Sequence, residues 1–280
     1  MNSYYRQKSV LITGAASGIG KNLAEKLFQL GSTLYLWDIQ EDRLRQMKES
    51  QFHNSDRVQI QRVDQTDPDD LINRSGRHVQ SGAIPDILIH CAGVVTGKLF
   101  TDHTTSEIRT SIQVNLESMM LITAQFLPGM IQRGSGAIVP VASASGYIGN
   151  PKMSVYASTK WGVIGWAESL RLELEETAPG IRVTTIIPGY VDTGMFRGVR
   201  PPLFVPLLKT SDLSDQILQG VKAGKRTVQA PFMVRITPIL RALLPARLFD
   251  WLAGSLFGVY RSMDTFQGRS RNGPENREGS

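Results

Sequence analysis

The chain has 280 residues, of which 41% are hydrophobic and 20% charged, a composition that excludes a disordered protein or a membrane bundle and fits one globular domain. Its single cysteine, Cys91, excludes an internal disulfide and is expected to be buried and inert, and the four histidines show no metal-ligand spacing. The net charge of +6 comes from residues 222–280, which hold ten basic and four acidic residues. Such a basic end attracts nucleic acid, anionic lipid or an acidic partner, unless it is only a solvated surface.

Short apolar runs alternate with segments of helical periodicity along the first two thirds of the chain. Residues 1–8 are polar and the next apolar run is short, which predicts neither a signal peptide nor a transmembrane helix. A strand at 9–13 runs through a glycine turn into a helix at 19–30. We expect further strands at 33–37, 58–63, 84–92, 137–141 and 182–187, and helices at 42–50, 105–131 and 155–176. This alternation predicts an α/β fold with a doubly wound parallel sheet covered on both faces.

The turn after the first strand carries the glycine pattern T-G-x-x-x-G-I-G at residues 13–20. Glycines permit a tight turn and a close backbone approach, and the helix amino terminus offers amide donors and partial positive charge to a pyrophosphate. The pattern therefore predicts a dinucleotide site, although a purely structural turn can use the same residues. The contacts predicted in this turn are Gly14, Ser17, Gly18, Ile19 and Gly20.

Asp38 follows the second predicted strand, where a carboxylate accepts hydrogen bonds from an adenosine ribose and repels a 2′-phosphate. Neither Ile39 nor residues 15–17 supply a Lys or Arg that would hold such a phosphate. The sequence therefore predicts NAD as cofactor, with NADP less favoured, and places Asp38 and Ile39 among its contacts. The alternative is that Asp38 only ends a strand.

Tyr156 and Lys160 stand four residues apart on a predicted helix and therefore share one of its faces. An ammonium group near the phenol stabilises the phenolate, and we expect it to lower the tyrosine pKa from about 10 toward neutral pH. Ser143 follows the strand at 137–141, where its hydroxyl can hold a substrate oxygen. The pattern Y-x-x-x-K alone usually marks only one face of a helix, so this prediction depends on the order of all the motifs along the chain.

In this order the motifs resemble those of the short-chain dehydrogenase/reductase family, over residues 8–195. The resemblance implies a Rossmann-type fold and a nicotinamide-dependent oxidoreductase that acts on alcohols or ketones. In the catalytic set that it implies, Tyr156 exchanges the hydroxyl proton and Ser143 orients the substrate oxygen. Lys160 would also bind the nicotinamide ribose, and Asn115 would anchor a proton-relay water. The remaining cofactor contacts that the resemblance implies are Asp64, Gln65, Ala92, Gly93, Pro188, Gly189, Val191 and Thr193.

One departure from the family pattern follows the fourth strand, where residues 90–93 read His-Cys-Ala-Gly instead of Asn-Asn-Ala-Gly. Loss of two amides puts the side-chain bracing of this sheet edge in doubt, while backbone contacts to the adenosine can remain. We interpret His90 as a structural residue.

The chain is interpreted as a single domain with extensions. A catalytic core at 1–195 continues into a substrate lid at 196–230, an apolar and basic segment at 231–266 and a disordered tail at 267–280. The lid composition predicts a hydrophobic alcohol or ketone and loosely resembles family members that act on retinoids, steroids or long-chain keto-lipids; ordinary packing is the alternative. The residues behind this prediction are Met195, Phe196, Val199, Leu203, Phe204, Val205, Leu207 and Leu208.

Three other functions stay open at this point. They are a catalytically silent dinucleotide-binding scaffold or redox sensor, a dehydrogenase of small polar alcohols, and a nucleic-acid binder. The last is disfavoured because the basic end carries no recognition motif, so no nucleic acid is expected as a partner. The family resemblance implies a homodimer or homotetramer, and we expect a cytoplasmic location.

Residues 231–262 combine many apolar and aromatic side chains with four arginines, and two prolines divide the segment into short pieces. No piece reaches the roughly 18 apolar residues that span a bilayer, so we predict peripheral contact with a membrane surface or a hydrophobic partner. A subunit interface or a lid over the active site is the alternative.

Overall fold

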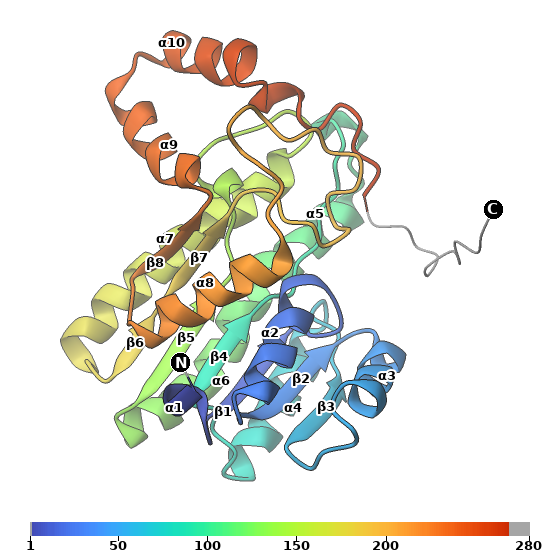
Figure 1. Cartoon of the computed structure of the whole chain (residues 1–280), viewed down its shortest axis with the longest axis vertical. Helices are drawn as coiled ribbons and strands as arrows, with labels where there is room; N and C mark the ends of the chain where they lie inside the picture. The colour runs from blue at the N-terminus through green and yellow to red at the C-terminus, as the bar shows by residue number, and fades with distance from the viewer. Residues whose placement is uncertain (1, 269–280) are drawn as a thin grey trace.

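The computed structural model describes residues 2–268 and contains a six-stranded parallel sheet in the order β3-β2-β1-β4-β5-β6 (Figure 1). A second sheet pairs β7 with β8 in parallel, and a bridge between Val141 and Ile186 joins it to the end of β5. The predicted doubly wound parallel sheet is therefore confirmed. The strands are β1 (Ser9–Thr13), β2 (Thr33–Asp38), β3 (Val58–Arg62), β4 (Ile87–His90), β5 (Gly136–Pro140), β6 (Ile181–Val183), β7 (Thr185–Pro188) and β8 (Thr227–Ala230).

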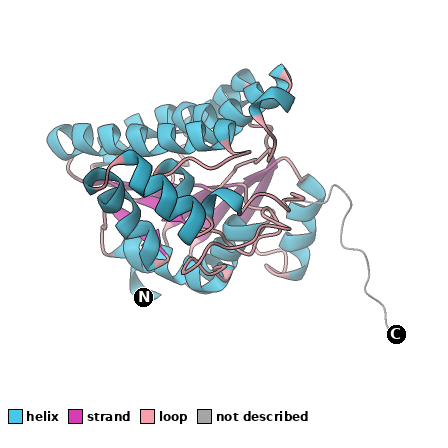
Figure 2. Ribbon diagram, turned by 90° about the horizontal axis from the view of Figure 1, so that it is seen from above, coloured by secondary structure: helices cyan, strands magenta, loops and turns pink. Residues whose placement is uncertain are grey.

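Helices cover both faces of the sheet because successive strand residues point to opposite sides. In β1, Val10 and Ile12 pack into one hydrophobic cluster and Leu11 packs into the other. Side chains of α2, α3 and α8 fill the first cluster, and those of α4, α6 and α7 fill the second. Figure 2 shows the strands between these helices. The bounds are α2 (Gly18–Gln29), α3 (Glu41–Ser50), α4 (Pro68–Gln80), α6 (Ser118–Arg133), α7 (Ser154–Thr177) and α8 (Thr210–Lys222).

Several elements were not predicted from the periodicity, namely α1, α4, α8, β8 and the two helices after β8. Within the described residues 2–268, no helix has the length and apolar character that crossing a membrane requires. Of the tail expected at 267–280, residues 269–280 lie outside the described part of the chain. The remaining helical segments are α1 (Asn2–Tyr5), α5 (Thr105–Ile112), α9 (Phe232–Leu243), α10 (Ala246–Trp251), the π-helical turns Gln113–Glu117 and Leu252–Leu256, and the 3-10 turns Phe100–Asp102, Ala144–Gly146 and Val259–Arg261.

Two predicted elements are wrong in detail. The single strand expected at 182–187 is two strands, because the chain changes sheets at Thr184. The Thr184 amide donates to the Ile138 carbonyl of β5 at 2.9 Å, while its hydroxyl donates to the Lys225 carbonyl before β8 at 2.7 Å. The long helix expected at 105–131 is α5 followed by a π-helical turn and α6.

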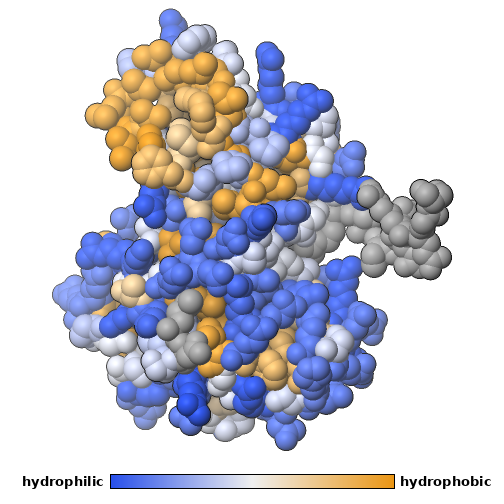
Figure 3. All heavy atoms as spheres, in the orientation of Figure 1, coloured by the Kyte–Doolittle hydropathy of each residue, from blue (hydrophilic) through white to orange (hydrophobic). Residues whose placement is uncertain are grey.

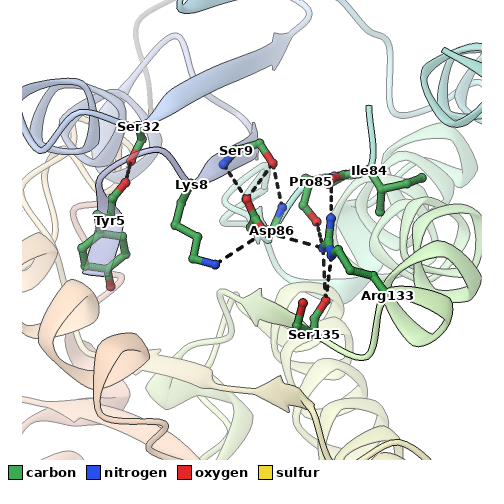
Figure 4. Close-up of polar contacts among 9 residues, drawn as sticks. All are labelled: Tyr5, Lys8, Ser9, Ser32, Ile84, Pro85, Asp86, Arg133 and Ser135. Carbon is green, nitrogen blue, oxygen red and sulfur yellow. Dashed lines mark hydrogen bonds and ion pairs between the residues drawn. The ribbon is translucent and has the colours of Figure 1, made fainter. Parts of the chain in front are cut away.

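Asp86 ties together the starts of β1 and β4 at the amino edge of the sheet (Figure 4). Its Oδ2 accepts hydrogen bonds from the Ser9 amide at 2.8 Å and the Ser9 hydroxyl at 3.0 Å. Lys8 Nζ and Arg133 lie 3.6 and 3.9 Å from its other oxygen. Arg133 also donates to the carbonyls of residues 84, 85 and 135, which brings the start of β5 into the same network. These charge-assisted bonds fix the strand starts. Because the strands are parallel, their carboxyl ends meet at the opposite edge.

Candidate functional site

A cavity of about 280 Å³ lies along the carboxyl edge of the sheet, at the ends of β1 to β5 and beside the segment after β7. This is where open α/β sheets bind ligands, since the loops that follow parallel strands converge there. All predicted cofactor and catalytic residues line it except Gly20 and Asn115. Those in the lining are Gly14, Ser17, Gly18, Ile19, Asp38, Ile39, Asp64, Gln65, Ala92, Gly93, Ser143, Tyr156, Lys160, Pro188, Gly189, Val191 and Thr193.

The glycine turn between β1 and α2 has a backbone that only glycine adopts without strain. Gly14 and Gly18 have φ angles of +66° and +55°. A Cβ at Gly14 would lie 2.6 Å from the Ala92 amide nitrogen, so the turn and the loop after β4 are in close contact. Gly20 does not line the cavity; a Cβ there would overlap the Gly14 carbonyl. Gly20 thus permits the turn, and the contact predicted for it is not part of the cavity wall.

Asp38 connects the end of β2 to the glycine turn. One carboxylate oxygen accepts the Ala16 amide at 2.9 Å and the other accepts the Gln40 amide at 2.9 Å. A carboxylate has about four acceptor sites, so these two bonds leave capacity for the hydroxyls of a ribose. The side chain is buried and borders the cavity. Its position therefore fits a site for the adenosine half of a dinucleotide.

Asp64 and Gln65 lie in the loop after β3, at the same end of the cavity. Asp64 Oδ1 accepts both the amide of Thr66 at 2.9 Å and its hydroxyl at 2.7 Å. Gln65 Oε1 accepts from the Ser118 hydroxyl of α6 at 2.8 Å. These bonds hold the loop in place, and both residues still border the cavity.

Tyr156 and Lys160 project from the first turns of α7 toward Ser143, which follows β5. Lys160 Nζ donates to the Val141 carbonyl at 2.9 Å and lies 5.6 Å from the centroid of the Tyr156 ring. Ser143 Oγ accepts the Ser145 amide at 3.1 Å. All three side chains are buried and border the cavity. The structure thus brings together the three residues that the sequence motifs singled out.

Burial dominates the acid-base properties of this group. It raises the pKa of Tyr156 to about 12, and the adjacent Ser143 hydroxyl acts in the opposite direction. Burial also lowers the pKa of Lys160 to about 8, with Cys91 acting weakly the other way. We expected Lys160 to lower the tyrosine pKa toward neutral pH, and this is wrong for the structure as it stands, because desolvation disfavours both charged forms.

Asn115 lies in the π-helical turn between α5 and α6 and does not border the cavity. Its Oδ1 accepts the Val94 amide at 2.7 Å, and its Nδ2 donates to the Val94 carbonyl at 2.9 Å and to Thr159 Oγ1 at 3.2 Å. A π-helical turn inserts an extra residue and redirects side chains, and such turns are frequent at functional sites. In this structure Asn115 fixes the loop after β4 against α7.

The residues that depart from the family pattern, His90 and Cys91, have different surroundings. The His90 ring nitrogen lies 2.9 Å from Thr123 Oγ1, and burial lowers its pKa to about 3, so the ring is neutral. Cys91 is partly exposed as a residue and borders the cavity, but its thiol group is desolvated, which agrees with the expectation of a buried and inert thiol. Burial raises its pKa to about 12, so the thiol stays protonated.

A strap formed by residues 262–266 covers Tyr156, and the sequence did not predict it. Met263 packs into a cluster with Tyr156 and Met153, and Phe266 packs against the same cluster. Ser262 fixes the strap: its hydroxyl accepts from Asn150 Nδ2 at 2.8 Å and lies 2.7 Å from the Tyr190 hydroxyl. These contacts join residues up to 112 positions apart. No local pattern signals them.

The predicted substrate lid is only partly at the site. Met195 and Phe196 border the cavity, and the Phe196 ring lies 6.1 Å from that of Tyr156, edge to face. Val199 packs against the same cluster. The other apolar residues of the lid lie elsewhere: Leu203, Phe204 and Leu207 are exposed, Val205 lines a second cavity, and Leu208 packs on the main core.

In the described part of the chain, no three His, Cys, Asp or Glu side chains come together as a metal site. The cavity instead offers the carboxylates after β2 and β3 at one end, the glycine turn after β1 in the middle, and a buried Ser, Tyr and Lys beside β5 at the other. This donor set fits a dinucleotide with its reactive ring beside Tyr156.

Comparisons with known proteins agree with this geometry. The family described as short chain dehydrogenase matches residues 8–203. Human epidermal retinol dehydrogenase 2 is 30% identical over 261 residues, covering 92% of this chain and 84% of the relative. Estradiol 17-beta-dehydrogenase 11 of Macaca fascicularis is 30% identical over 85% of this chain and 79% of its own. A short-chain dehydrogenase from Sphingobium yanoikuyae, solved in complex with NADPH, is 27% identical and superposes with a TM-score of 0.73, covering 97% of this chain and all of that one.

Proposed function

The chain belongs to the short-chain dehydrogenase family and is an NAD(P)-dependent oxidoreductase acting on CH–OH groups, and from this premise we propose that its substrate is a hydrophobic alcohol or ketone. The observation that carries the proposal is the apolar cluster around Tyr156, in which Met153 and Met263 are buried and Phe196, which borders the cavity, and Phe266 pack against them. A polar substrate would lose its hydration there without finding partners, whereas an apolar one gains by burial. The relatives named for retinol and estradiol agree with this chemistry.

We propose that the coenzyme binds along the cavity, with its pyrophosphate at the glycine turn and its adenosine ribose at Asp38. The nicotinamide supplies or accepts the hydride. Pro188, Gly189 and Thr193, in the segment that begins at the end of β7, border the same cavity as Tyr156, which favours them as neighbours of the nicotinamide. Asp64 and Gln65 would flank the adenine.

In the reduction of a ketone, Tyr156 would donate its phenolic proton to the carbonyl oxygen as hydride reaches the carbonyl carbon. Ser143 would donate a hydrogen bond to the same oxygen and orient it. The charge of Lys160 would stabilise the phenolate that remains, and its Nζ can also donate to the nicotinamide ribose. Asn115 would act indirectly, by holding the loop after β4 in place. The family resemblance implies a further role, in which Asn115 anchors a proton-relay water. In oxidation the same steps run in reverse.

The substrate class is tested by a panel assayed through the absorbance of the reduced coenzyme. The panel contains a retinoid, a steroid ketone, a long-chain ketone and small polar alcohols, each with NAD(H) and NADP(H). We expect kcat/KM to be at least tenfold higher for the apolar members, since each buried methylene contributes about 0.8 kcal/mol. A preference for the small polar alcohols contradicts the proposed substrate, and coenzyme binding without turnover of any member favours a silent scaffold or redox sensor.

We also propose that NAD(H) is preferred over NADP(H), because the Asp38 carboxylate would face a 2′-phosphate. Asp38→Asn keeps the size of the side chain and removes its charge. We expect the ratio of kcat/KM for NAD(H) over NADP(H) to fall by about tenfold or more, since one unpaired like charge at close range costs roughly 1–2 kcal/mol. Asp42→Asn, on the first turn of α3, is the control and should leave the ratio unchanged. A wild-type preference for NADP(H) contradicts the assignment.

A further inference from the structure

Helices α9 and α10 form a hairpin at the top of the molecule, away from the six-stranded sheet (Figure 1). Their inner faces enclose a second cavity of about 50 Å³, lined by Met233 and Leu240 of α9 and Phe249 of α10, among others. This cavity shares no lining residue with the active-site cavity. The hairpin therefore encloses this cavity together with Ile148, Leu203 and Val205, and it does not line the coenzyme site, which argues against a lid.

A neighbouring side of the hairpin is apolar and exposed. On α9, Phe232, Ile239 and Leu243 are spaced by seven and four residues, so they lie on one face of the helix; their side chains are 68%, 57% and 76% exposed. On α10, Leu248 and Trp251 are also exposed. Figure 3 shows hydrophobic residues gathered over both helices. We call these five residues the outer hairpin face.

Positive charge borders this face. Arg235 and Arg247 are exposed on α9 and α10, and Arg261 is exposed just beyond them. None of the three forms an ion pair with a residue in 2–268. The one acidic residue in 231–262, Asp250, accepts a hydrogen bond from the Tyr260 hydroxyl at 2.6 Å. Within residues 2–268, no ion pair therefore compensates the charge of the border.

We propose that the outer hairpin face binds the surface of an anionic phospholipid bilayer. Leucine, isoleucine and phenylalanine side chains at such a surface enter the acyl boundary, tryptophan lies at the headgroup level, and arginines contact lipid phosphates. A second copy of the chain fits less well. A twofold contact places the same face on both sides, so the unpaired arginines of the two copies would meet.

Two short turns connect the hairpin to the strap over Tyr156. They are the π-helical turn 252–256 and the 3-10 turn 259–261, after which Ser262 and Met263 contact Tyr190 and Tyr156. Docking of the outer hairpin face would therefore bring the apolar side of the active site close to the bilayer. Binding itself needs no turnover, so it can be measured separately from the proposed enzyme activity.

The test is co-sedimentation of the full-length protein with phosphatidylcholine vesicles that contain or lack phosphatidylserine, at low and high salt. We expect binding to the anionic vesicles at low salt and much weaker binding in high salt or to phosphatidylcholine alone. Each arginine at the surface contributes about fivefold in affinity, so Arg235→Gln with Arg247→Gln should weaken binding by about 25-fold. Ile239→Ser with Leu243→Ser should weaken it by at least tenfold.

Matched controls remove similar groups elsewhere on the surface. Arg43→Gln on α3 removes an exposed arginine and Ile72→Ser on α4 removes a partly exposed isoleucine, and both should bind as the wild type does. Tyr156→Phe should also bind normally, so a failure of catalysis is distinguished from a failure of docking. Thermal unfolding checks that each variant is folded.

Three outcomes overturn the proposal. The first is that the wild type stays in the supernatant with anionic vesicles at low salt. The second is that folded variants of the outer hairpin face bind the vesicles as tightly as the wild type. Ile239→Ser with Leu243→Ser can also halve the mass measured by light scattering while vesicle binding is absent, which would identify the face as a subunit interface.

Discussion

Tyr156→Phe is expected to lower kcat by about 10²- to 10⁴-fold, the usual contribution of a positioned acid or base. The phenylalanine ring keeps the packing against Phe196 and Met263 and loses only the oxygen that carries the proton. Coenzyme affinity should change little, because the glycine turn and Asp38 are unaffected. Steady-state rates and a fluorescence titration of the reduced coenzyme measure the two effects.

Tyr190→Phe is the matched control. It also removes one partly buried hydroxyl, which lies 2.7 Å from Ser262 Oγ, but in the proposed mechanism this hydroxyl carries no proton to the substrate. We expect its kcat to stay within about tenfold of the wild type, with an increase in KM if the strap loosens. If Tyr156→Phe retains more than a tenth of the wild-type kcat at saturating substrate, Tyr156 is not the proton donor.

Lys160→Met is expected to lower the rate of ketone reduction by about 10²-fold at neutral pH and to weaken coenzyme binding. Methionine fits the space of the lysine stem and lacks the charge that would stabilise the phenolate. Burial lowers the pKa of Lys160 to about 8, so its charge is present below pH 8 and is lost as the pH rises through that value. Tyr156, with its pKa raised to about 12 by burial, stays protonated across this range. The wild-type rate of reduction should therefore decline above about pH 8.

The pH profile of kcat/KM, measured from pH 6 to 10 on both proteins, checks this assignment. The wild type should show the decline, and Lys160→Met should give a low and flat profile, because it has no ammonium group to titrate. A flat wild-type profile over this range, or a variant that keeps the decline, contradicts the role given to Lys160.

The layered core was predictable because it follows from local periodicity. Short stretches of sequence determine both the alternation of Val10, Leu11 and Ile12 between two clusters and the glycine turn into α2. The division of the strand at Thr184 was not predictable, because its hydrogen bonds go to Ile138 and Lys225, far along the chain. The helix α4 was missed because most of its residues are polar and Leu71 is its only large buried side chain.

In the candidate site, too, the features set by local sequence were predictable and those set by contacts between distant segments were not. Its motifs lie at strand ends, and parallel strands bring their carboxyl ends together, so local patterns indicated Asp38, Ser143 and Tyr156 as neighbours of one cavity. The strap through Ser262 and Met263 depends on contacts between distant segments, which no spacing rule describes. The pKa of Tyr156 was also predicted wrongly, because the sequence shows the nearby charge of Lys160 but not the burial that raises the tyrosine pKa.

We expect this chain to transfer hydride between a nicotinamide coenzyme and a hydrophobic substrate, with Tyr156 as the proton donor. The most direct measurement uses reduced coenzyme that carries deuterium at the transferable position of the nicotinamide, together with a hydrophobic ketone. Mass spectrometry of the product should show one deuterium on the carbinol carbon with the wild-type protein, and almost none over the same time with Tyr156→Phe. Tight coenzyme binding without deuterium transfer to any ketone of the panel, or equal transfer by the variant, would contradict the account.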